Sequence, residues 1–410
     1  MVKNICIIGG GIGGCVTAIK LSNNTDYKIS LFEKDSKLLN LPYCHLHAGG
    51  FLYPQLPLDE CKELLIHSLL FANFFKNCLE KRPTIIAYSK NEVEYSSENL
   101  LTKAKFIQNE YKKVLNEEEF KNKNKNNLIL GKPEDFYAIY TKSDVIFYKK
   151  NGYLKKNNLV HDIYVGKFCK ELNDIESIQY PFISVNEYGI SMIKIREYIN
   201  VELDKKNISV YKNCKIEIIK QNEMKWIINN EKFDYLINSC GYEVNKVRPN
   251  EIKKTYEFLE LKSSWVIKTK VDMDYIFPEI TIIGKRGTEN GMIQISPLNE
   301  RNVFQIHLMT NESTLFNGSL VLDKQVILQR TDKTIKEISK VFKMFKDAEY
   351  YSEPMWGIQR IANLSKEKRA DSVIFNYPMY AEIQIVKGIS SVFSANKITN
   401  KISLDLSNKY

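Results

Sequence analysis

Three glycines near the start of the chain have the spacing of a turn that binds a diphosphate. In "GGGIGG", residues 9–14, Gly9, Gly11 and Gly14 satisfy the pattern G-x-G-x-x-G. The first glycine of such a turn permits the tight bend, the second lets the main chain approach a pyrophosphate, and the third lets the following helix pack against the preceding strand. The helix then directs its N-terminal N–H groups at the phosphates. The pattern predicts that a dinucleotide lies against this turn.

An acidic residue stands where the ribose of such a dinucleotide is bound. Glu33 ends the apolar run "KISLFE", about 20 residues beyond the last glycine, which is the usual distance to a carboxylate that accepts ribose hydroxyls. An acid rather than an arginine at this place disfavours a 2′-phosphate. We count the adjacent Lys34 among the candidate cofactor-binding residues. The motif alone does not separate NAD from FAD.

The other groups able to do chemistry do not form a metal site. His45 and His47 lie close together in "CHLHAGGFLYP", residues 44–54, but no third ligand is near them in the sequence. The eight cysteines are scattered and form no C-x-x-C pair, so we interpret them as small buried hydrophobes. No metal is predicted.

The elements that must position these residues follow from the hydrophobic pattern. "NICII", the glycine turn, an apolar-periodic helix and "KISLFE" predict strand, turn, helix and strand. Further helices are expected at 61–75, at 192–206, around 335–345 and after 386; strands are expected within 208–240 and 262–310. Residues 83–188 read as short aromatic-rich runs alternating with polar loops.

Composition excludes several classes of protein. The net charge is +10, but the lysines are dispersed among acids and asparagines without the aromatic-lined basic stripe of a nucleic-acid binder. No stretch approaches the roughly 20 apolar residues of a membrane span, and the apolar run at the N-terminus reads as a strand rather than a signal peptide. We therefore expect a cytoplasmic protein that binds neither nucleic acid nor membrane.

The order of several further motifs resembles FAD-dependent oxidoreductases of the D-amino-acid oxidase, glycine oxidase and sarcosine dehydrogenase superfamily. The glycine turn opens the chain, and four stretches resemble the superfamily's later cofactor contacts: "CHLHAGGFLYP", "VYKNCKI", "YLINSCGY" and "IVKGISS". The resemblance implies FAD as the cofactor. The further cofactor contacts that it implies are Gly49, Gly50, Ile216, Ser239, Gly241, Lys387 and Gly388. In the last stretch, a lysine or a helix N-terminus near the O2 edge of the flavin ring would stabilise the negative charge that develops there on reduction.

The resemblance also implies a fold. We expect an α/β protein in which a Rossmann-like, three-layer FAD-binding domain is interleaved with an α+β substrate domain built on a mainly antiparallel sheet. The predicted FAD-binding domain comprises residues 1–82, 189–250 and 352–410. The predicted substrate or cap domain comprises residues 83–188 and 251–351.

His47 holds the place of a histidine that, in the dimethylglycine- and sarcosine-dehydrogenase branch, bonds covalently to the flavin 8α-methyl. The resemblance implies the same bond here. A histidine that lines the flavin pocket, and an ordinary loop histidine, remain as alternatives.

The expected reaction is dehydrogenation of a CH–NH or CH–OH carbon of a small amino or hydroxy acid, with hydride passing to flavin N5 and the electrons to an unidentified acceptor. An arginine would clamp a substrate carboxylate. Arg360 in "WGIQRI" and Arg286 in "GKRGTENG" are the candidates, and His307 could border the same pocket. Two alternatives remain open: an NAD(P)-dependent dehydrogenase, and a flavoprotein whose flavin is structural or serves a partner.

Overall fold

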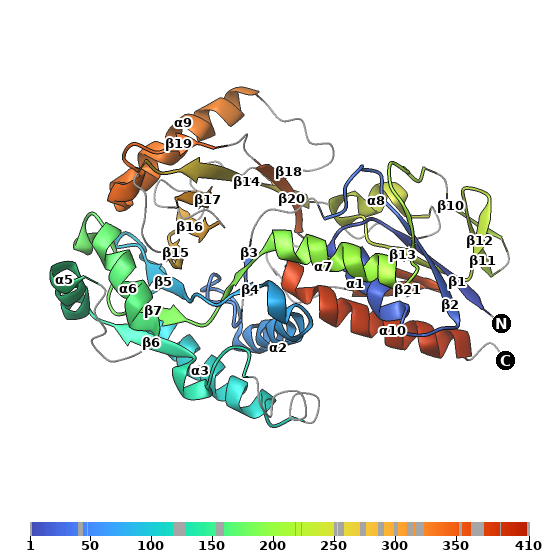
Figure 1. Ribbon diagram of the computed structural model, residues 1–410, viewed down its shortest axis with the longest axis horizontal. Helices are drawn as coiled ribbons and strands as arrows, with labels where there is room; N and C mark the ends of the chain where they lie inside the picture. Colours follow the sequence, from blue (N-terminus) through green and yellow to red (C-terminus); the bar gives the residue numbers. More distant parts are fainter. Residues whose placement is uncertain are drawn as a thin grey trace.

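One large β-sheet lies at the centre of each of two lobes (Figure 1). The computed structural model describes residues 2–39, 44–46, 48–117, 128–152, 160–217, 219–222, 224–249, 252, 258–270, 276–285, 291–298, 302–309, 315–316, 324–351, 355–361, 373–385 and 387–407. Both ends of the chain lie in the same lobe, so the chain crosses to the other lobe and returns (Figure 1).

The sheet of the first lobe has the strand order β21-β22-β13-β1-β2-β9. Its strands are β1 (Lys3–Ile8), β2 (Tyr27–Phe32), β9 (Ser209–Tyr211), β13 (Tyr235–Asn238), β21 (Val373–Tyr377) and β22 (Tyr380–Ile383). β1 is parallel to both of its neighbours, β2 and β13, whereas β21 runs antiparallel to β22. The first strand, β1, lies inside this sheet, with β2 on one side and β13 on the other. The C-terminal end of β1 is therefore a topological switch point, which is the place where open α/β sheets bind ligands.

Helices cover one face of this sheet and a small antiparallel sheet covers the other. Alternate residues of β1 point to opposite faces: Ile5 and Ile7 pack in the cluster with the helices, whereas Cys6 and Ile8 pack with Trp226 of the small sheet. The helices are α1 (Ile12–Leu21), α7 (Met192–Lys205) and α10 (Ser391–Ser407). The small sheet is β10 (Ile219–Asn222), β11 (Lys225–Ile228) and β12 (Glu231–Phe233). This is the predicted three-layer, Rossmann-like architecture.

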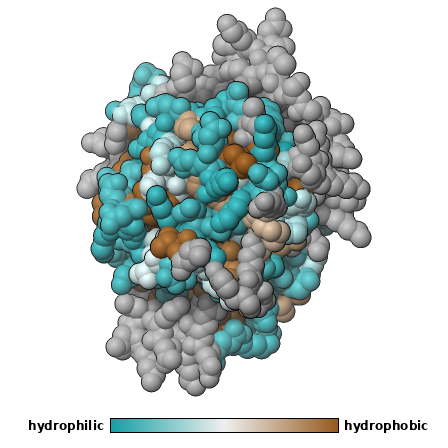
Figure 2. Space-filling view, turned by 90° about the vertical axis from the view of Figure 1, so that its right-hand side faces the viewer, coloured by the Kyte–Doolittle hydropathy of each residue, from teal (hydrophilic) through white to brown (hydrophobic). Residues whose placement is uncertain are grey.

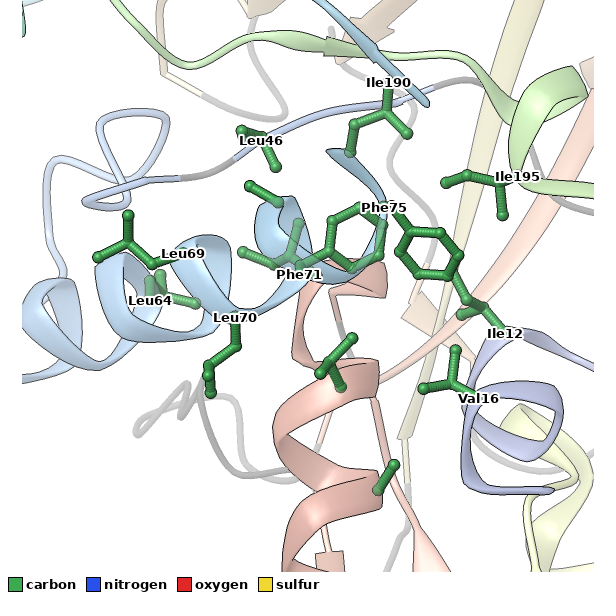
Figure 3. Close-up of a cluster of buried hydrophobic side chains, with 14 of the residues drawn as sticks. Ile12, Val16, Leu46, Leu64, Leu69, Leu70, Phe71, Phe75, Ile190 and Ile195 are labelled. Atoms are coloured by element: carbon green, nitrogen blue, oxygen red, sulfur yellow. The ribbon is translucent and has the colours of Figure 1, made fainter. Parts of the chain in front are cut away.

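The helix α2 (Leu58–Phe74) joins the two lobes through the hydrophobic cluster around α1 (Figure 3). Phe75, directly after α2, is buried and lies between Ile190, Ile195 of α7 and Ile12 of α1 (Figure 3). These contacts hold α1, and thus the turn before it, against the rest of the molecule.

The sheet of the second lobe has the order β18-β14-β17-β16-β15-β5-β7-β6. Its strands are β5 (Thr84–Tyr88), β6 (Tyr137–Tyr140), β7 (Phe182–Val185), β14 (Phe258–Lys268), β15 (Glu279–Ile283), β16 (Met292–Pro297), β17 (Val303–Met309) and β18 (Leu315–Phe316), with β19 (Glu349–Tyr350) and β20 (Met355–Ile361) paired to β14. Its pairs are antiparallel except β5–β15. The helices α5 (Lys142–Asn151), α6 (Val160–Glu171) and α9 (Lys324–Val341) lie along one side of this lobe (Figure 1).

The prediction for residues 83–188 was wrong, because the described part of this stretch contains long helices as well as strands. Besides α5 and α6, this part of the chain contains α3 (Ser97–Val114), which begins with a capping box between Ser96 and Asn99. Its apolar residues Leu100, Ile107 and Val114 recur at helical spacing, but the charged residues between them resemble a polar loop. The predicted domain boundaries stay a prediction; β20 pairs with the second sheet although it lies within the range assigned to the first domain.

The outer face of the first lobe is largely hydrophilic, with scattered hydrophobic patches (Figure 2). Among the residues that the structure describes, no helix is long and apolar enough to cross a membrane.

A buried ion pair fixes the segment that follows β22. Arg248 donates to both carboxylate oxygens of Glu382 at 2.5 Å, and Tyr380 Oη donates to the same carboxylate at 2.8 Å. Both charged side chains are almost completely inaccessible to water. Gln384, two residues closer to the C-terminal helix, donates to Glu382 at 2.8 Å.

Glu382→Gln should destabilise the protein strongly, because the variant leaves the Arg248 guanidinium buried without its counterion. The expected loss in the free energy of unfolding is about 3 to 5 kcal/mol, measured by urea denaturation. The partly exposed pair of Lys401 and Asp405 on α10 is the control: Lys401→Ala should change stability by less than about 1 kcal/mol. Equal effects of the two substitutions would contradict this interpretation.

A buried histidine joins α2 to the start of α10. His67 Nδ1 and Ser390 Oγ are hydrogen-bonded at 3.0 Å, and the imidazole packs on Phe393. Burial, with a smaller effect of Lys397, lowers the pKa of His67 to about 4. The unfolded chain therefore binds a proton near pH 6.5 that the folded protein does not accept until about pH 4.

The free energy of unfolding should fall by about 3 kcal/mol from this group as the pH drops from above 6.5 to below 4. Denaturation of wild type and His67→Gln across this range isolates the contribution, because other titrating groups are common to both proteins. A stability difference between the two proteins that does not change with pH would show that His67 is not held neutral.

Candidate functional site

The turn between β1 and α1 is packed so closely that two of its glycines have no room for a side chain. A Cβ on Gly9, whose φ is +104°, would lie 2.5 Å from the carbonyl oxygen of Ser239. A Cβ on Gly14 would lie 2.1 Å from the carbonyl oxygen of Gly9. Gly9 is therefore required where β1 passes the end of β13, and Gly14 where α1 lies against the turn, as the sequence predicted for the first and third glycines.

Gly11 is different, because no described atom lies within 4 Å of a Cβ built on it. It is the N-cap residue of α1 with an ordinary extended backbone, and among the described residues no side chain caps this helix. The first turn of α1 also contains no acidic residue. The packing of the protein does not require a glycine here, and the approach of an anion to the N-terminal N–H groups of α1 stays a prediction.

Glu33 lies directly beside the turn. Its Oε2 accepts a hydrogen bond from the backbone N–H of Gly10 at 2.6 Å, and its Oε1 accepts from the N–H of Asp35 at 2.8 Å. These bonds fix the carboxylate at the C-terminal end of β2. The carboxylate and the glycine turn therefore lie side by side, while the binding of Glu33 to ribose stays a prediction.

Further predicted cofactor residues surround the same ends of β1, β2 and β13. Ser239 Oγ lies 2.7 Å from the carbonyl oxygen of Gly9, which ties β13 to the turn. Lys34 forms an ion pair with Glu243 just beyond Gly241. No described atom lies within 4 Å of a Cβ on Gly241. Ile216 is buried in the hydrophobic cluster beneath the small sheet.

The segment that carries the histidines runs between the lobes. Its short strand β3 (Cys44–His45) pairs with β8 (Gly189–Ile190), which also pairs with β4 (Leu79–Glu80). A Cβ on Gly49 would lie 2.9 Å from Ile107, and one on Gly50 would lie 3.0 Å from Leu64. The protein's own packing thus accounts for both glycines, so they are weaker evidence for a cofactor than Gly11. His47 lies outside the described residues.

Lys387 and Gly388 lead from β22 into α10. The Lys387 ammonium is buried and lies 4.6 Å from the centroid of the Tyr53 ring. No described atom comes within 4 Å of a Cβ on Gly388, which begins the turn of 3₁₀-helix Gly388–Ser390. The structure thereby brings the predicted C-terminal motif to the segment that follows His47.

Two further buried ionisable side chains at this place were missed by the sequence analysis. Lys103 of α3 donates to the carbonyl oxygen of Tyr53 at 2.7 Å. Glu187, after β7, is completely buried, and its burial raises the pKa of the carboxyl well above its usual value, against the opposing effect of Lys103 and Lys387. A lysine within the apolar stripe of a helix was the signal that could have identified Lys103.

The structure tests the predicted catalytic residues only in part. His307 is partly buried on β17, and its Nε2 lies 2.7 Å from Gln305 Nε2. Arg360 lies on β20 opposite Leu259 of β14, but its side chain is outside the described part. Arg286 also lies outside the described residues. The structure therefore places His307 in the second sheet and does not assemble the three residues into one site.

Comparison with known proteins supports the fold. A family model described as an NAD(P)-binding Rossmann-like domain matches residues 7–40, which contain the glycine turn and Glu33. No curated protein matches the chain in sequence.

Solved structures match over almost the whole chain. Glycine oxidase from Geobacillus kaustophilus is 11% identical with a TM-score of 0.62, and the match covers 98% of this chain and 95% of that one. L-α-glycerophosphate oxidase from Mycoplasma pneumoniae, solved with FAD bound, is 16% identical with a TM-score of 0.59, over 98% and 95%. L-proline dehydrogenase from P. horikoshii is 12% identical with a TM-score of 0.63, over 98% and 94%. The chain thus has the two-lobe fold of these oxidoreductases, and the predicted fold class is confirmed.

Proposed function

We propose that this protein binds FAD in the turn between β1 and α1 and uses it to oxidise a small molecule. The observation that carries the proposal is Gly11 at the N-terminus of α1. No described atom is close enough to require a glycine there, and no described side chain caps the helix. Glu33, fixed beside the same turn, supplies acceptors for ribose hydroxyls. The position of both groups at the switch point of the sheet supports a dinucleotide ligand.

The residues around this turn fit the two ends of FAD. Gly11 and the first N–H groups of α1 would hold the diphosphate, and Glu33 the adenosine ribose. Ile216, Ser239 and Gly241 would border the adenosine half. At the other end, Lys387 and Gly388 would approach the flavin ring together with the segment that contains His47, Gly49 and Gly50. The cation of Lys387 would favour negative charge on the bound ring.

The proposed reaction is dehydrogenation of a CH–NH or CH–OH carbon of a small amino or hydroxy acid. Bound FAD would supply the acceptor for the hydride of that carbon, and a proton would leave the nitrogen or oxygen, so that a C=N or C=O bond would form and the two electrons would pass to oxygen or another acceptor. The protein's own residues hold and orient the substrate, for which Arg360, Arg286 and His307 are the candidates.

The cysteines whose side chains the structure describes are all free thiols, which suits the reducing environment of the cytoplasm that we propose as the location.

A second candidate function rests on the match of residues 7–40 to an NAD(P)-binding domain. On that alternative the same turn would hold a nicotinamide dinucleotide. Glu33 would then favour NAD over its 2′-phosphorylated form.

The absorption spectrum of the purified protein, before and after acid precipitation, tests the cofactor. We expect flavin bands in the native protein or after reconstitution with FAD. Colour that stays in the precipitate would show a covalent bond, which His47→Ala should abolish; colour that passes to the supernatant would show that His47 forms none. A colourless protein that ignores FAD but binds NAD would contradict the proposal and favour the alternative.

Gly11→Ala and Gly14→Ala form a matched pair that separates cofactor binding from folding. Gly11→Ala should change the stability of the cofactor-free protein by at most about 1 kcal/mol and weaken FAD binding roughly ten-fold or more, because the added methyl group occupies the place of the diphosphate. Gly14→Ala should cost at least about 2 kcal/mol, because its Cβ meets backbone. Unfolding curves and FAD titrations measure both; unchanged FAD affinity in Gly11→Ala would refute this site.

A further inference from the structure

The segment that follows Glu33 turns back over the glycine turn. The backbone N–H of Leu39 donates to the carbonyl oxygen of Gly10 at 3.1 Å. A Cβ built on Gly10 would clash with Cδ2 of Leu38, so this leucine covers the middle of the turn. Leu38 and Leu39 are both almost completely buried. These two residues therefore form one wall of the turn between β1 and α1.

Leu39 has a backbone conformation that a leucine seldom adopts. Its φ is +58°, in the left-handed region that favours glycine. Such a conformation costs free energy and persists only where the surrounding contacts enforce it. Two hydrogen bonds do so here, because the N–H of Leu39 donates to Gly10 and its carbonyl oxygen accepts from Nη2 of Arg196 at 3.2 Å. Arg196 of α7 thus fixes the wall of the turn from outside.

Arg196 lies near the N-terminus of α1. It follows Ile195 on α7, and Phe75 lies between Ile195 and Ile12, the first residue of α1 (Figure 3). Two hydrogen bonds and the length of one residue connect the guanidinium to Gly10, which places the two groups within about 10 Å of each other. This separation is close to the Debye length in physiological salt, so a charge on Arg196 acts on an anion bound at the turn.

The charge of Arg196 is not balanced by an acidic side chain in the described part of the protein. The side chain is half-buried, and its described hydrogen bond goes to a neutral carbonyl oxygen. Glu33, the carboxylate of this turn, bonds instead to the N–H groups of Gly10 and Asp35. A half-buried cation without a counterion costs free energy, which a bound anion would offset.

Arg82 shows the contrast. Its guanidinium is also buried, but it donates to the carboxylate of Glu279 at 2.9 Å, so that charge is balanced within the protein. A buried arginine is therefore no sign of a ligand by itself. What distinguishes Arg196 is a charge without a described counterion at the place where an anionic cofactor is proposed.

The N-terminus of α1 adds positive charge at the same place. The first turn of this helix contains no acidic residue, and no described side chain caps it. A helix end supplies only about half an elementary charge, which is less than a diphosphate carries. A guanidinium supplies a full charge, and its planar set of N–H groups matches phosphate oxygens. The helix end and Arg196 together are thus better suited to a diphosphate than either is alone.

We propose that Arg196 binds the diphosphate of FAD and holds the wall formed by Leu38 and Leu39 against it. This rests on the proposed function. The guanidinium uses one of its several N–H groups for Leu39, so one side chain can fix this wall and attract the diphosphate. The cofactor thereby gains a side-chain cation in addition to the N–H groups of α1.

Binding of ADP and of adenosine to the flavin-free, full-length protein tests this assignment, because the two probes differ only in the diphosphate. In Arg196→Gln, titration calorimetry should show ADP binding weakened about ten-fold or more, with adenosine binding unchanged. Arg196→Lys keeps the charge and should recover most of the ADP affinity. Added salt should weaken ADP binding more in wild type than in Arg196→Gln, because the variant lacks the screened charge.

Lys194→Gln is the matched control. Lys194 lies on the same helix, and its ammonium donates to the carboxylate of Glu80 at 2.8 Å, so its replacement should leave ADP binding unchanged. Equal ADP affinities of wild type and Arg196→Gln, or an equal loss of adenosine binding, would overturn the assignment. Equal losses in Arg196→Lys and Arg196→Gln would also overturn it, because the effect would then come from the bond to Leu39 and not from the charge.

The same titrations separate this assignment from the proposed function. A wild-type protein that binds neither ADP nor FAD would overturn both. A wild-type protein that binds FAD with an affinity that Arg196→Gln does not change would overturn the assignment alone. Melting temperatures of the flavin-free variants identify any loss that comes from misfolding.

Discussion

The contact between β1, β13 and α1 is the constraint on which the rest of the structure depends. At this point the backbones approach so closely that a methyl group on Gly9 or Gly14 would meet backbone atoms. The close approach fixes the N-terminus of α1 above the end of the central strand, and Ser239 holds the neighbouring strand to the same turn. The site is thus built from main chain on rigid elements, which suits it to a ligand bound by charge and shape.

A second feature is the charge buried where the lobes meet. Lys103, Lys387 and Glu187 surround the segment around Tyr53, and the pair of Arg82 and Glu279 lies beneath β8. Buried charges cost free energy unless they are paired and hydrogen-bonded, and here Arg82 bonds to Glu279 while Lys103 bonds to the carbonyl oxygen of Tyr53.

The sequence predicted the first lobe well because local signals there agree with the tertiary structure. The strand, glycine turn, helix and acidic residue at 3–33 appear where their spacing placed them, and the helix at 192–206 is observed as α7. Lys103 and Glu187 were missed because they meet only through long-range contacts. His307 was a candidate from the sequence, but its place opposite Gln294 depends on strand register, which a single sequence does not supply.

A crystal structure of the protein reconstituted with FAD tests the central claim most directly. Our account predicts the diphosphate against Gly11 and the first turn of α1, with the ribose hydroxyls on Glu33 and the flavin ring directed toward Lys387 and the second sheet. A dinucleotide bound elsewhere, or a turn at Gly11 filled by the protein's own atoms, would contradict it.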